Sequence, residues 1–416
     1  MEEIINMSLK NKNILITGIS GFVGAYLAEK LINEGSNVYG LVRRRSDGSI
    51  PKNINNHDLN GKFTPLTGDL TDYTAVSKAL KESEPDYIFH LAAQSFVPQS
   101  FDNPTDTEDN NSKGTNNLLE AMRLADTDAR MVFAGSSEEY GLVFSSKQQY
   151  DAIIKQYGSI FPDIVDGKID ELPISETNPL RPMSPYAVSK VYGDYLSRNY
   201  YHSYDVDTVV SRAFNHEGAG RGNMFVTSVV TNQVMQLKMG LTDKIVIGNV
   251  NAFRDWTHVN DIVEGYIALA QKAKSGNVYN QGSMRTNSII TYILLSLNQA
   301  GYNVESIETF NGDKQVNNPT EINKDKYYGV SFEKTKVDSM LLDNKLEYTI
   351  KDKGINVKTD KGVVKVEFNP ARFRPAEVPI LFSNTEKIQK LGVEVKHTVS
   401  DIIDDQLDYY SNVENQ

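Results

Sequence analysis

The sequence of 416 residues contains no cysteine, which excludes disulfide bonds and thiolate metal ligands. Its six histidines are scattered, so no metal site is predicted. The 43 Lys and Arg are outnumbered by 54 Asp and Glu. The resulting formal net charge of -11 argues against general binding to nucleic acid or to anionic membrane surfaces. An anionic ligand must therefore be held by locally placed arginines.

Long apolar runs are also missing. No stretch approaches the ~20 residues that a membrane helix needs. The segment 1–10 carries two glutamates and lacks the apolar core of a signal peptide. Hydrophobic residues make up 39% and charged residues 23% of the chain, as in an ordinary globular protein. We therefore expect a cytoplasmic protein with neither nucleic-acid nor membrane partners.

Short apolar runs alternate with amphipathic stretches through the first half of the chain. This pattern is typical of βαβ units and predicts an α/β fold with a doubly wound parallel sheet. A helix is expected over 25–34, after a glycine turn. The predicted strands are 13–17, 37–42, 87–91, 130–134 and 208–212.

The expected organisation is an N-terminal extension (1–10), a cofactor-binding domain (11–215) and a mainly substrate-binding lobe (216–416), of which some segments return to the first domain. Two stretches look inserted, near 142–180 and 284–365. Within the second, charged and β-branched residues alternate over 351–366 around Gly354 and Gly362, which predicts a hairpin. Extra packing or an oligomer contact is the favoured role of both stretches over a catalytic one.

Three glycines follow the first predicted strand in Gly-x-x-Gly-x-x-Gly spacing, at Gly18, Gly21 and Gly24. Such positions let the backbone approach a pyrophosphate, and the following helix N-terminus offers free N–H groups and a positive dipole end. The alternative is an ordinary glycine turn. The position directly after an apolar strand favours a dinucleotide site.

The second predicted strand ends in Arg43, Arg44 and Arg45. NAD sites usually place an acidic residue there for the ribose 2′-hydroxyl, whereas cations suit a 2′-phosphate. NADP is therefore predicted over NAD, with a solvated basic loop as the alternative. Asp69, at the end of the third strand, suits the adenine amino group.

Tyr186 and Lys190 are four residues apart, which puts them on one face of a helix. A nearby ammonium and a positively charged cofactor ring are expected to pull the pKa of the phenol below its reference of ~10. Ser136 and Glu138 follow the strand over 130–134, at the edge where parallel sheets bind ligands. Glu138 offers a carboxylate there, and the alternative is that it only caps a helix.

Together these motifs resemble the extended short-chain dehydrogenase/reductases that process nucleotide-sugars, and among them the GDP-mannose 4,6-dehydratases. The likeness covers roughly 11–282 and 366–409. Further matching segments are Leu91-Ala92-Ala93-Gln94-Ser95, Phe214-Asn215-His216-Glu217, Arg221-Gly222, Phe225-Val226-Thr227, Gly248-Asn249, Arg254-Asp255-Trp256 and Phe373-Arg374-Pro375-Ala376-Glu377-Val378.

The resemblance implies a Rossmann-type domain with a smaller C-terminal α/β lobe, and a homodimer or homotetramer. It implies catalysis by Ser136, Glu138, Tyr186 and Lys190. NADP would contact Gly18, Ser20, Gly21, Phe22, Val23, Arg43, Arg44, Asp69, Leu70, Leu91, Ala92, Ala93, Tyr186 and Lys190. The nucleotide-sugar would contact Ser95, Ser137, Asn215, Arg221, Val226, Arg254, Arg374 and Glu377.

The implied reaction oxidises carbon 4 of the sugar with Tyr186 as base, removes the carbon 5 proton with Glu138, expels water from carbon 6 and returns hydride there. The chain departs from the family where Ser228 and Val229 replace Arg-Lys, so the nucleotide base stays open. A rival is a 4-epimerase of the same fold, which needs no acid at Glu138. A second rival is a nucleotide-sugar-binding protein without turnover.

Overall fold

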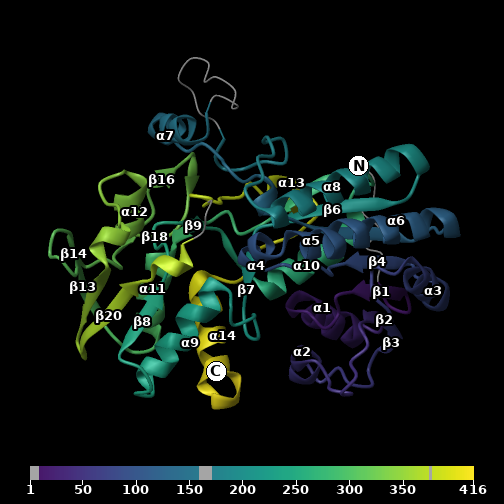
Figure 1. Cartoon of the computed structure of the whole chain (residues 1–416), viewed down its shortest axis with the longest axis horizontal. Coiled ribbons are helices and arrows are strands. Elements are labelled where there is room, and N and C mark those ends of the chain that lie inside the picture. Colours follow the sequence, from purple (N-terminus) through teal and green to yellow (C-terminus); the bar gives the residue numbers. More distant parts are fainter. Residues whose placement is uncertain (1–8, 159–170, 374–376) are drawn as a thin grey trace.

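The computed structural model describes residues 9–158, 171–373 and 377–416. The chain forms two lobes that lie side by side in Figure 1, with α14 (Val399–Ser411) between them. The segment 1–8 of the predicted N-terminal extension and 159–170 of the first inserted stretch lie outside the described residues.

The first lobe is built on a seven-stranded sheet in the order β11-β6-β5-β4-β1-β2-β3, and all of its strand pairs are parallel. The strand order reverses at β1, where doubly wound sheets leave a crevice at the carboxyl ends of their strands. This confirms the predicted fold class. The strands are β1 (Asn13–Thr17), β2 (Asn37–Val42), β3 (Thr64–Thr67), β4 (Tyr87–His90), β5 (Arg130–Ser136), β6 (Thr208–Ala213) and β11 (Val278–Gln281).

Apolar side chains on both faces of these strands explain the burial of the sheet. In β1, Ile14 and Ile16 belong to one core cluster and Leu15 to another, because successive strand side chains point to opposite faces. A strand that is buried on both faces needs a continuous apolar run, and 13–17 supplies one.

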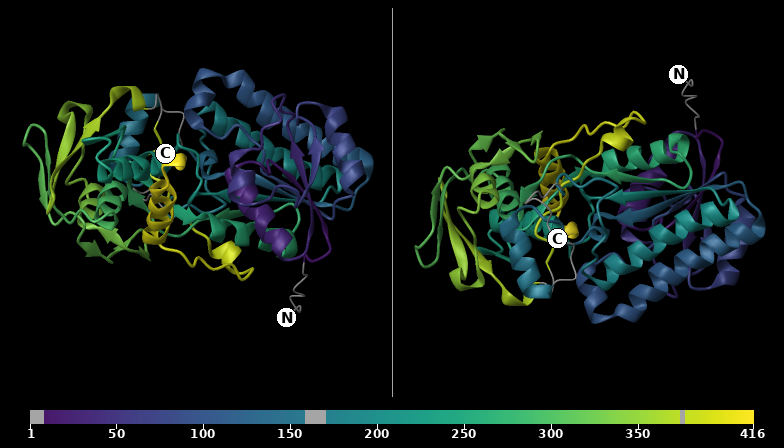
Figure 2. Two further views of the ribbon diagram at one scale, coloured as in Figure 1. Left: turned by 90° about the horizontal axis from the view of Figure 1, so that it is seen from below. Right: turned by 90° about the horizontal axis from the view of Figure 1, so that it is seen from above.

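Helices cover both faces of the sheet, as Figure 2 shows. One face packs against α1 (Phe22–Asn33) and α10 (Val259–Lys272), and the other against α3 (Tyr73–Ser83), α6 (Gly114–Ala125) and α8 (Pro185–Tyr204). The side chain of Asp72 caps α3, and that of Ser184 caps α8 by accepting from Ala187 N at 3.1 Å. The cap at Ser184 fixes the start of α8 at Pro185, one residue before Tyr186.

The second lobe contains a five-stranded sheet in the order β14-β13-β19-β20-β8. The predicted hairpin is confirmed, since β19 and β20 pair antiparallel from Gly354↔Glu367 to Thr359↔Gly362. β20 then pairs parallel with β8. These strands are β8 (Lys244–Ile247), β13 (Val304–Thr309), β14 (Gln315–Asn317), β19 (Gly354–Thr359) and β20 (Gly362–Phe368), and they share a core with α9 (Val226–Lys238), α11 (Ile289–Gln299) and α14.

The division of the chain at residue 215 stays a prediction. Both α10 and β11 follow that residue and pack with the first lobe. The other helical segments are α2 (Lys52–Asn56), α4 (Val97–Asp102), α5 (Pro104–Glu108), η1 (Asp109–Lys113), η2 (Ser137–Glu139), α7 (Lys147–Tyr157), α12 (Lys336–Leu342), η3 (Ile350–Asp352), η4 (Pro370–Arg372), α13 (Glu386–Gln389) and η5 (Val413–Asn415). The other strands are β7 (Asn215–Glu217), β9 (Phe253–Arg254), β10 (Trp256–His258), β12 (Asn287–Ser288), β15 (Ile322–Asn323), β16 (Lys326–Tyr327), β17 (Val330–Ser331) and β18 (Lys334–Thr335).

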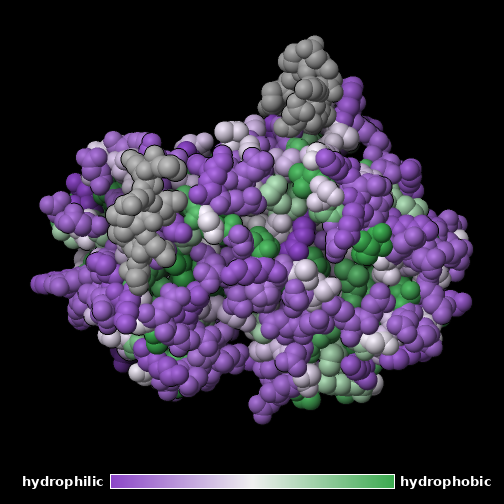
Figure 3. Space-filling model, turned by 180° about the vertical axis from the view of Figure 1, so that it is seen from behind, coloured by the Kyte–Doolittle hydropathy of each residue, from purple (hydrophilic) through white to green (hydrophobic). Residues whose placement is uncertain are grey.

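Hydrophilic side chains dominate the face of the molecule in Figure 3, and hydrophobic ones form small separate patches there. Among the described residues, no helix is both long and apolar enough to cross a membrane.

Candidate active site

A cavity of about 2310 Å³ collects side chains from both lobes at the carboxyl ends of β1, β2, β4 and β5. Every predicted site residue except Arg374 lines it, and Arg374 lies outside the described residues. The lining includes Gly18, Ser20, Gly21, Phe22, Val23, Arg43, Arg44, Asp69, Leu70, Leu91, Ala92, Ala93, Ser95, Ser136, Ser137, Glu138, Tyr186, Lys190, Asn215, Arg221, Val226, Arg254 and Glu377.

The glycine turn fits a dinucleotide. A Cβ on Gly18 would lie 2.7 Å from the backbone nitrogen of Ala92, and its φ of +78° is one that residues with side chains rarely adopt. α1 begins at Phe22, three residues earlier than predicted, after the N-cap Gly21. Within the described part of the chain, no side chain caps this helix, and its first turn holds no acid. The backbone N–H groups there are therefore suited to a phosphate.

The end of β2 carries the three exposed arginines. Arg45 donates to Ser49 Oγ at 3.1 Å, while Arg43 interacts electrostatically with Asp69. Burial alone would raise the pKa of Asp69, but hydrogen bonds from Thr71 and the charge of Arg43 hold it below its ordinary value. Asp69 is thus an acceptor beside a cation, and both line the cavity.

Ser136 ends β5 and caps the short helix η2. Its hydroxyl accepts from Glu138 N at 3.2 Å, and its own N–H donates to Glu139 Oε1 at 2.7 Å. The capping acid is therefore Glu139, and the alternative role considered for Glu138 is wrong. Glu138 lines the cavity instead. Sequence reasoning missed Glu139, although serine followed three residues later by glutamate is the signal of a capping box.

Tyr186 and Lys190 lie on one face of α8, next to Ser136. The Tyr186 hydroxyl is hydrogen-bonded to Ser136, and Lys190 Nζ donates to Ala134 O at 2.7 Å. Burial raises the pKa of Tyr186 to about 12, opposite in direction to the depression expected from a nearby ammonium and a cofactor ring. Ser136 and Arg221 act in the opposite direction, and Glu138 and Glu139 add to the rise. Burial also lowers the pKa of Lys190 to about 8.

Arg221 is a second cation on the wall of the cavity. Its guanidinium stacks on Phe225 at 3.5 Å from the ring centroid and lies 3.4 Å from Glu217 Oε2. Burial lowers the pKa of Arg221, against the attraction of Glu217 and Tyr186. Ser228, one of the two departures from the family pattern, is buried and donates to Arg221 O at 3.0 Å, whereas Val229 lines the cavity.

Arg254 and Glu377 form an ion pair, with Nη2 and Oε1 2.9 Å apart. Arg254 also donates to the carbonyls of Phe253 and Val378, at 2.8 Å each. Asn215 lines the same cavity, and its buried Oδ1 has no hydrogen-bond partner among the described residues. This part of the wall offers a fixed guanidinium and a spare amide acceptor to a polar ligand.

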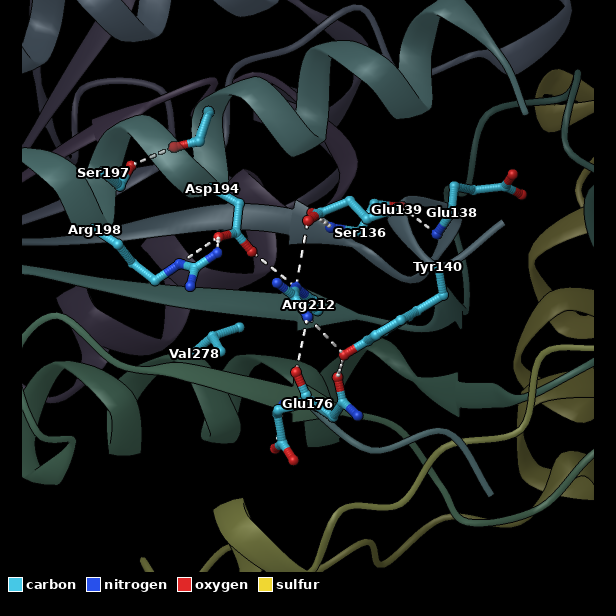
Figure 4. Close-up of polar contacts among 12 residues, drawn as sticks. Ser136, Glu138, Glu139, Tyr140, Glu176, Asp194, Ser197, Arg198, Arg212 and Val278 are labelled. Carbon is cyan, nitrogen blue, oxygen red and sulfur yellow. Dashed lines mark hydrogen bonds and ion pairs between the residues drawn. The ribbon is translucent and has the colours of Figure 1, made fainter. Parts of the chain in front are cut away.

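A polar cluster behind Ser136 was also missed. Figure 4 shows Arg212 at its centre, with Asp194 and Glu139 on one side and Tyr140 and Glu176 on the other. Arg212 lies in β6 and Asp194 in α8, so only the tertiary structure brings them together. Glu138 points away from this cluster. Within residues 9–158, 171–373 and 377–416, no three His, Asp or Glu side chains are grouped as metal ligands would be.

Comparisons with known proteins agree with this geometry. The sequence matches the NAD dependent epimerase/dehydratase family over residues 14–282. It is 32% identical over 400 residues to GDP-mannose 4,6-dehydratase of Yersinia enterocolitica, covering 94% of this chain and 91% of that protein. It is also 32% identical over 399 residues to GDP-mannose 4,6-dehydratase of Vibrio cholerae, with the same coverage of 94% and 91%.

Solved structures share the fold. RMD from Pseudomonas aeruginosa, complexed with NADPH, is 21% identical with a TM-score of 0.65, over 96% of this chain and 98% of that one. The UDP-glucose 4-epimerase of Thermus thermophilus, in complex with NAD, is 21% identical with a TM-score of 0.64, over 96% and 98%. At this identity the likeness extends to the fold alone.

Proposed function

Because the chain belongs to the NAD dependent epimerase/dehydratase family, we propose that it is a nucleotide-sugar 4,6-dehydratase that uses NADP. One observation carries the proposal: Glu138 lines the same cavity as Ser136, Tyr186 and Lys190. A serine, tyrosine and lysine serve the oxidation of a sugar hydroxyl, and a further carboxylate serves an elimination. The near full-length likeness to GDP-mannose 4,6-dehydratases supports the same reaction.

In the proposed first step, the phenolate of Tyr186 takes the proton of the sugar 4-hydroxyl. Ser136, already hydrogen-bonded to Tyr186, orients that hydroxyl. Burial disfavours the phenolate, because it raises the pKa of Tyr186. The positive charges of Lys190, of Arg221 and of the bound cofactor ring favour it.

In the second step, the ketone at carbon 4 acidifies the hydrogen on carbon 5, and Glu138 removes that proton. The hydroxyl on carbon 6 takes up a proton and leaves as water, which leaves a double bond between carbons 5 and 6. When hydride returns to carbon 6, carbon 5 takes up a proton, so the protons released from the 4-hydroxyl and from carbon 5 are both used. Bound NADP supplies the hydride acceptor for carbon 4 and the donor for carbon 6, so the cofactor is regenerated in each turnover. The reaction is therefore a net dehydration, catalysed by a lyase with an oxidoreductase fold.

NADP is proposed over NAD because Arg43 and Arg44 are exposed on the cavity wall where the adenosine ribose is expected. Asp69 would accept from the adenine amino group. Gly18, Gly21 and the first turn of α1 would hold the pyrophosphate.

The substrate is proposed to be a nucleoside-diphosphate hexose. Arg221 and Arg254 would bind its diphosphate, since a guanidinium offers bidentate hydrogen bonds to phosphate oxygens. Asn215 would contribute its amide, and Glu377 would accept from nucleoside hydroxyls. Ser95, Ser137 and Val226 would line the sugar and base positions. The side chain of Val229 offers no hydrogen bond to a base, so the identity of the base is left to the experiment.

The test is mass spectrometry of the products formed from GDP-mannose and, in parallel, from UDP- and CDP-hexoses, with NADP or NAD. We expect one of these sugars to give a product lighter by one water, without accumulation of NADPH. Glu138→Gln should abolish that product but retain cofactor binding. Glu82→Gln changes an exposed glutamate of α3 outside the cavity and should behave as wild type. An isomer of unchanged mass would instead identify a 4-epimerase.

The same proposal includes a cytoplasmic homo-oligomer. Val188, Tyr192 and Tyr195 are all exposed on one stripe of α8 (54%, 44% and 56%), and a contiguous apolar face of this kind suits a subunit contact. Sedimentation of wild type should give a dimer or larger, and Tyr195→Glu should shift it towards the monomer. A wild-type monomer would refute this part of the proposal.

A further inference from the structure

Two carboxyl groups share one guanidinium directly behind the proposed catalytic serine. Glu139 and Asp194 are both fully buried. Arg212 Nε lies 2.8 Å from Asp194 Oδ2 and 3.3 Å from Glu139 Oε2. The other oxygen of Asp194 accepts from Arg198 Nε at 2.6 Å. The cluster therefore joins α8, which carries Tyr186 and Lys190, to the ends of β5 and β6.

Glu139 holds the end of β5 through its other oxygen, Oε1. This atom accepts the N–H of Ser136 at 2.7 Å, so it fixes the residue whose hydroxyl contacts Tyr186. It also fills the space beside Gly135, where a Cβ would lie 2.6 Å from it. The backbone carbonyl of Ala134, the residue before Gly135, accepts a hydrogen bond from Lys190 Nζ. Glu139 and Lys190 thus hold neighbouring peptide groups of the same strand.

We propose that Glu139 is a positioning residue for the reaction: its carboxyl group fixes Ser136 through the backbone and supplies the buried counter-charge for Lys190. The predicted effect of Glu139 on turnover rests on the proposed dehydratase function. Glu139 acts through Ser136 and Lys190 and does not itself line the cavity.

Burial and the charged groups around Glu139 determine the pKa of its carboxyl group. Burial and the nearby Asp194 raise the pKa of Glu139 far above its ordinary value, against the opposing attraction of Arg212 and the Ser136 N–H. The carboxyl therefore keeps its proton to a higher pH than an exposed glutamate does. The titratable and charged groups that face the pair are Asp194, Lys190, Tyr186 and Arg198 from α8, Arg212 from β6 and Tyr140 from the turn after η2.

Ionisation of Glu139 stabilises the ammonium of Lys190, because a negative charge raises the pKa of its neighbours. Burial lowers the pKa of Lys190 to about 8 even with this opposing contribution from Glu139. Glu139 thus extends the range over which Lys190 is charged. In Glu139→Gln, the amide oxygen still accepts from Ser136 N, but the counter-charge is lost.

The experiment compares the pH profiles of kcat for wild type, Glu139→Gln and Glu139→Leu. In Glu139→Gln the alkaline limb should move to lower pH, by about one unit. In Glu139→Leu, kcat should also fall about tenfold at neutral pH, because the hydrogen bond that fixes Ser136 is gone. Asp401→Asn changes the acid of a distant capping box, at α14, and should leave the profile in place. If Glu139 had a purely structural role, its replacement would lower the rate without moving the alkaline limb. That result would overturn the proposal that Glu139 supplies a counter-charge for Lys190.

A second readout does not need turnover. Infrared titration of wild type should show a protonated carboxyl band that disappears at a higher pH than the bands of exposed carboxyls. The band should be absent from Glu139→Gln and present in Asp401→Asn. If no nucleotide-sugar is dehydrated but the band behaves in this way, the proposed function fails and the buried proton on Glu139 stands. A band that persists in Glu139→Gln would overturn the inference.

Discussion

Arg254 Nη2 lies 2.9 Å from Glu377 Oε1, so the guanidinium proposed for the substrate diphosphate already has a carboxylate partner. Two backbone carbonyls hold the same side chain. A phosphate that binds here meets a cation in a fixed position. The Arg254 side chain therefore loses little conformational entropy on binding.

Arg254→Met should therefore weaken substrate binding. Loss of a hydrogen bond to a charged group costs about 1.5–3 kcal/mol, which corresponds to an increase in KM of roughly 10- to 150-fold. Steady-state kinetics with the accepted nucleotide-sugar would measure it. Arg123→Met, which removes an arginine paired with Glu120 on α6, is the control. An unchanged KM in Arg254→Met would exclude this residue from the diphosphate site.

Tyr186→Phe should lower kcat by about 10²- to 10⁴-fold, the range expected when a general acid–base group is removed. The phenyl ring keeps the packing of α8, so NADPH binding, followed by fluorescence, should be retained. Residual activity near the wild-type level would show that another group takes the 4-hydroxyl proton.

Much of this site could be predicted from local sequence. The strand 37–42 was predicted with its observed bounds, and the Gly18 turn and the Tyr186/Lys190 pair follow from short-range spacing. α1 begins earlier than predicted because glycines around Phe22 and Val23 obscure the helical pattern.

Other features depend on contacts between distant segments. Arg212 contacts Asp194 and Glu139 only after β5, β6 and α8 have packed together. No local spacing in the sequence predicts these contacts. For the same reason, the sequence did not predict that burial raises the pKa of Tyr186. Desolvation is a property of the folded surroundings, and a sequence motif shows only the neighbouring charge.

Replacing both Arg43 and Arg44 with alanine should raise the KM for NADP by at least about tenfold, since each lost contact to a phosphate is worth about 1.5–3 kcal/mol. The KM for NAD should change little, because NAD lacks the 2′-phosphate. Arg45→Ala provides the comparison, since Arg45 already donates to Ser49. Equal effects on both cofactors would contradict the assignment of these arginines to the phosphate.

Gly135→Ala should destabilise the fold by about 1–3 kcal/mol, the usual cost of overpacking. The new Cβ would lie 2.6 Å from Glu139 Oε1 and 2.8 Å from Ser211 O. Thermal unfolding would measure the loss. Gly222→Ala meets its nearest atom at 3.4 Å and should leave Tm almost unchanged. Equal Tm values for the two variants would mean that the packing around Glu139 is looser than described.

The raised pKa of Glu139 also predicts how stability depends on pH. Unfolding exposes a carboxyl with a pKa of ~4.3, so between that value and the higher folded pKa only the folded chain keeps the proton. The stabilisation that comes from this retained proton is fully present below the unfolded pKa. It is lost as the pH rises towards the folded pKa. Glu139→Gln cannot titrate, and its unfolding free energy from denaturant titrations should fall less steeply between pH 5 and 8. Parallel curves for the two proteins would contradict a raised pKa.

The pairing of β20 with β8 has a consequence for the chain as it leaves the ribosome. The last strand of the seven-stranded sheet, β11, is complete at Gln281, so the first lobe can close early in synthesis. β8 is made earlier still, yet its partner β20 ends only at Phe368. During the interval between them, the nascent chain carries an open strand edge, which is a template for pairing with another chain.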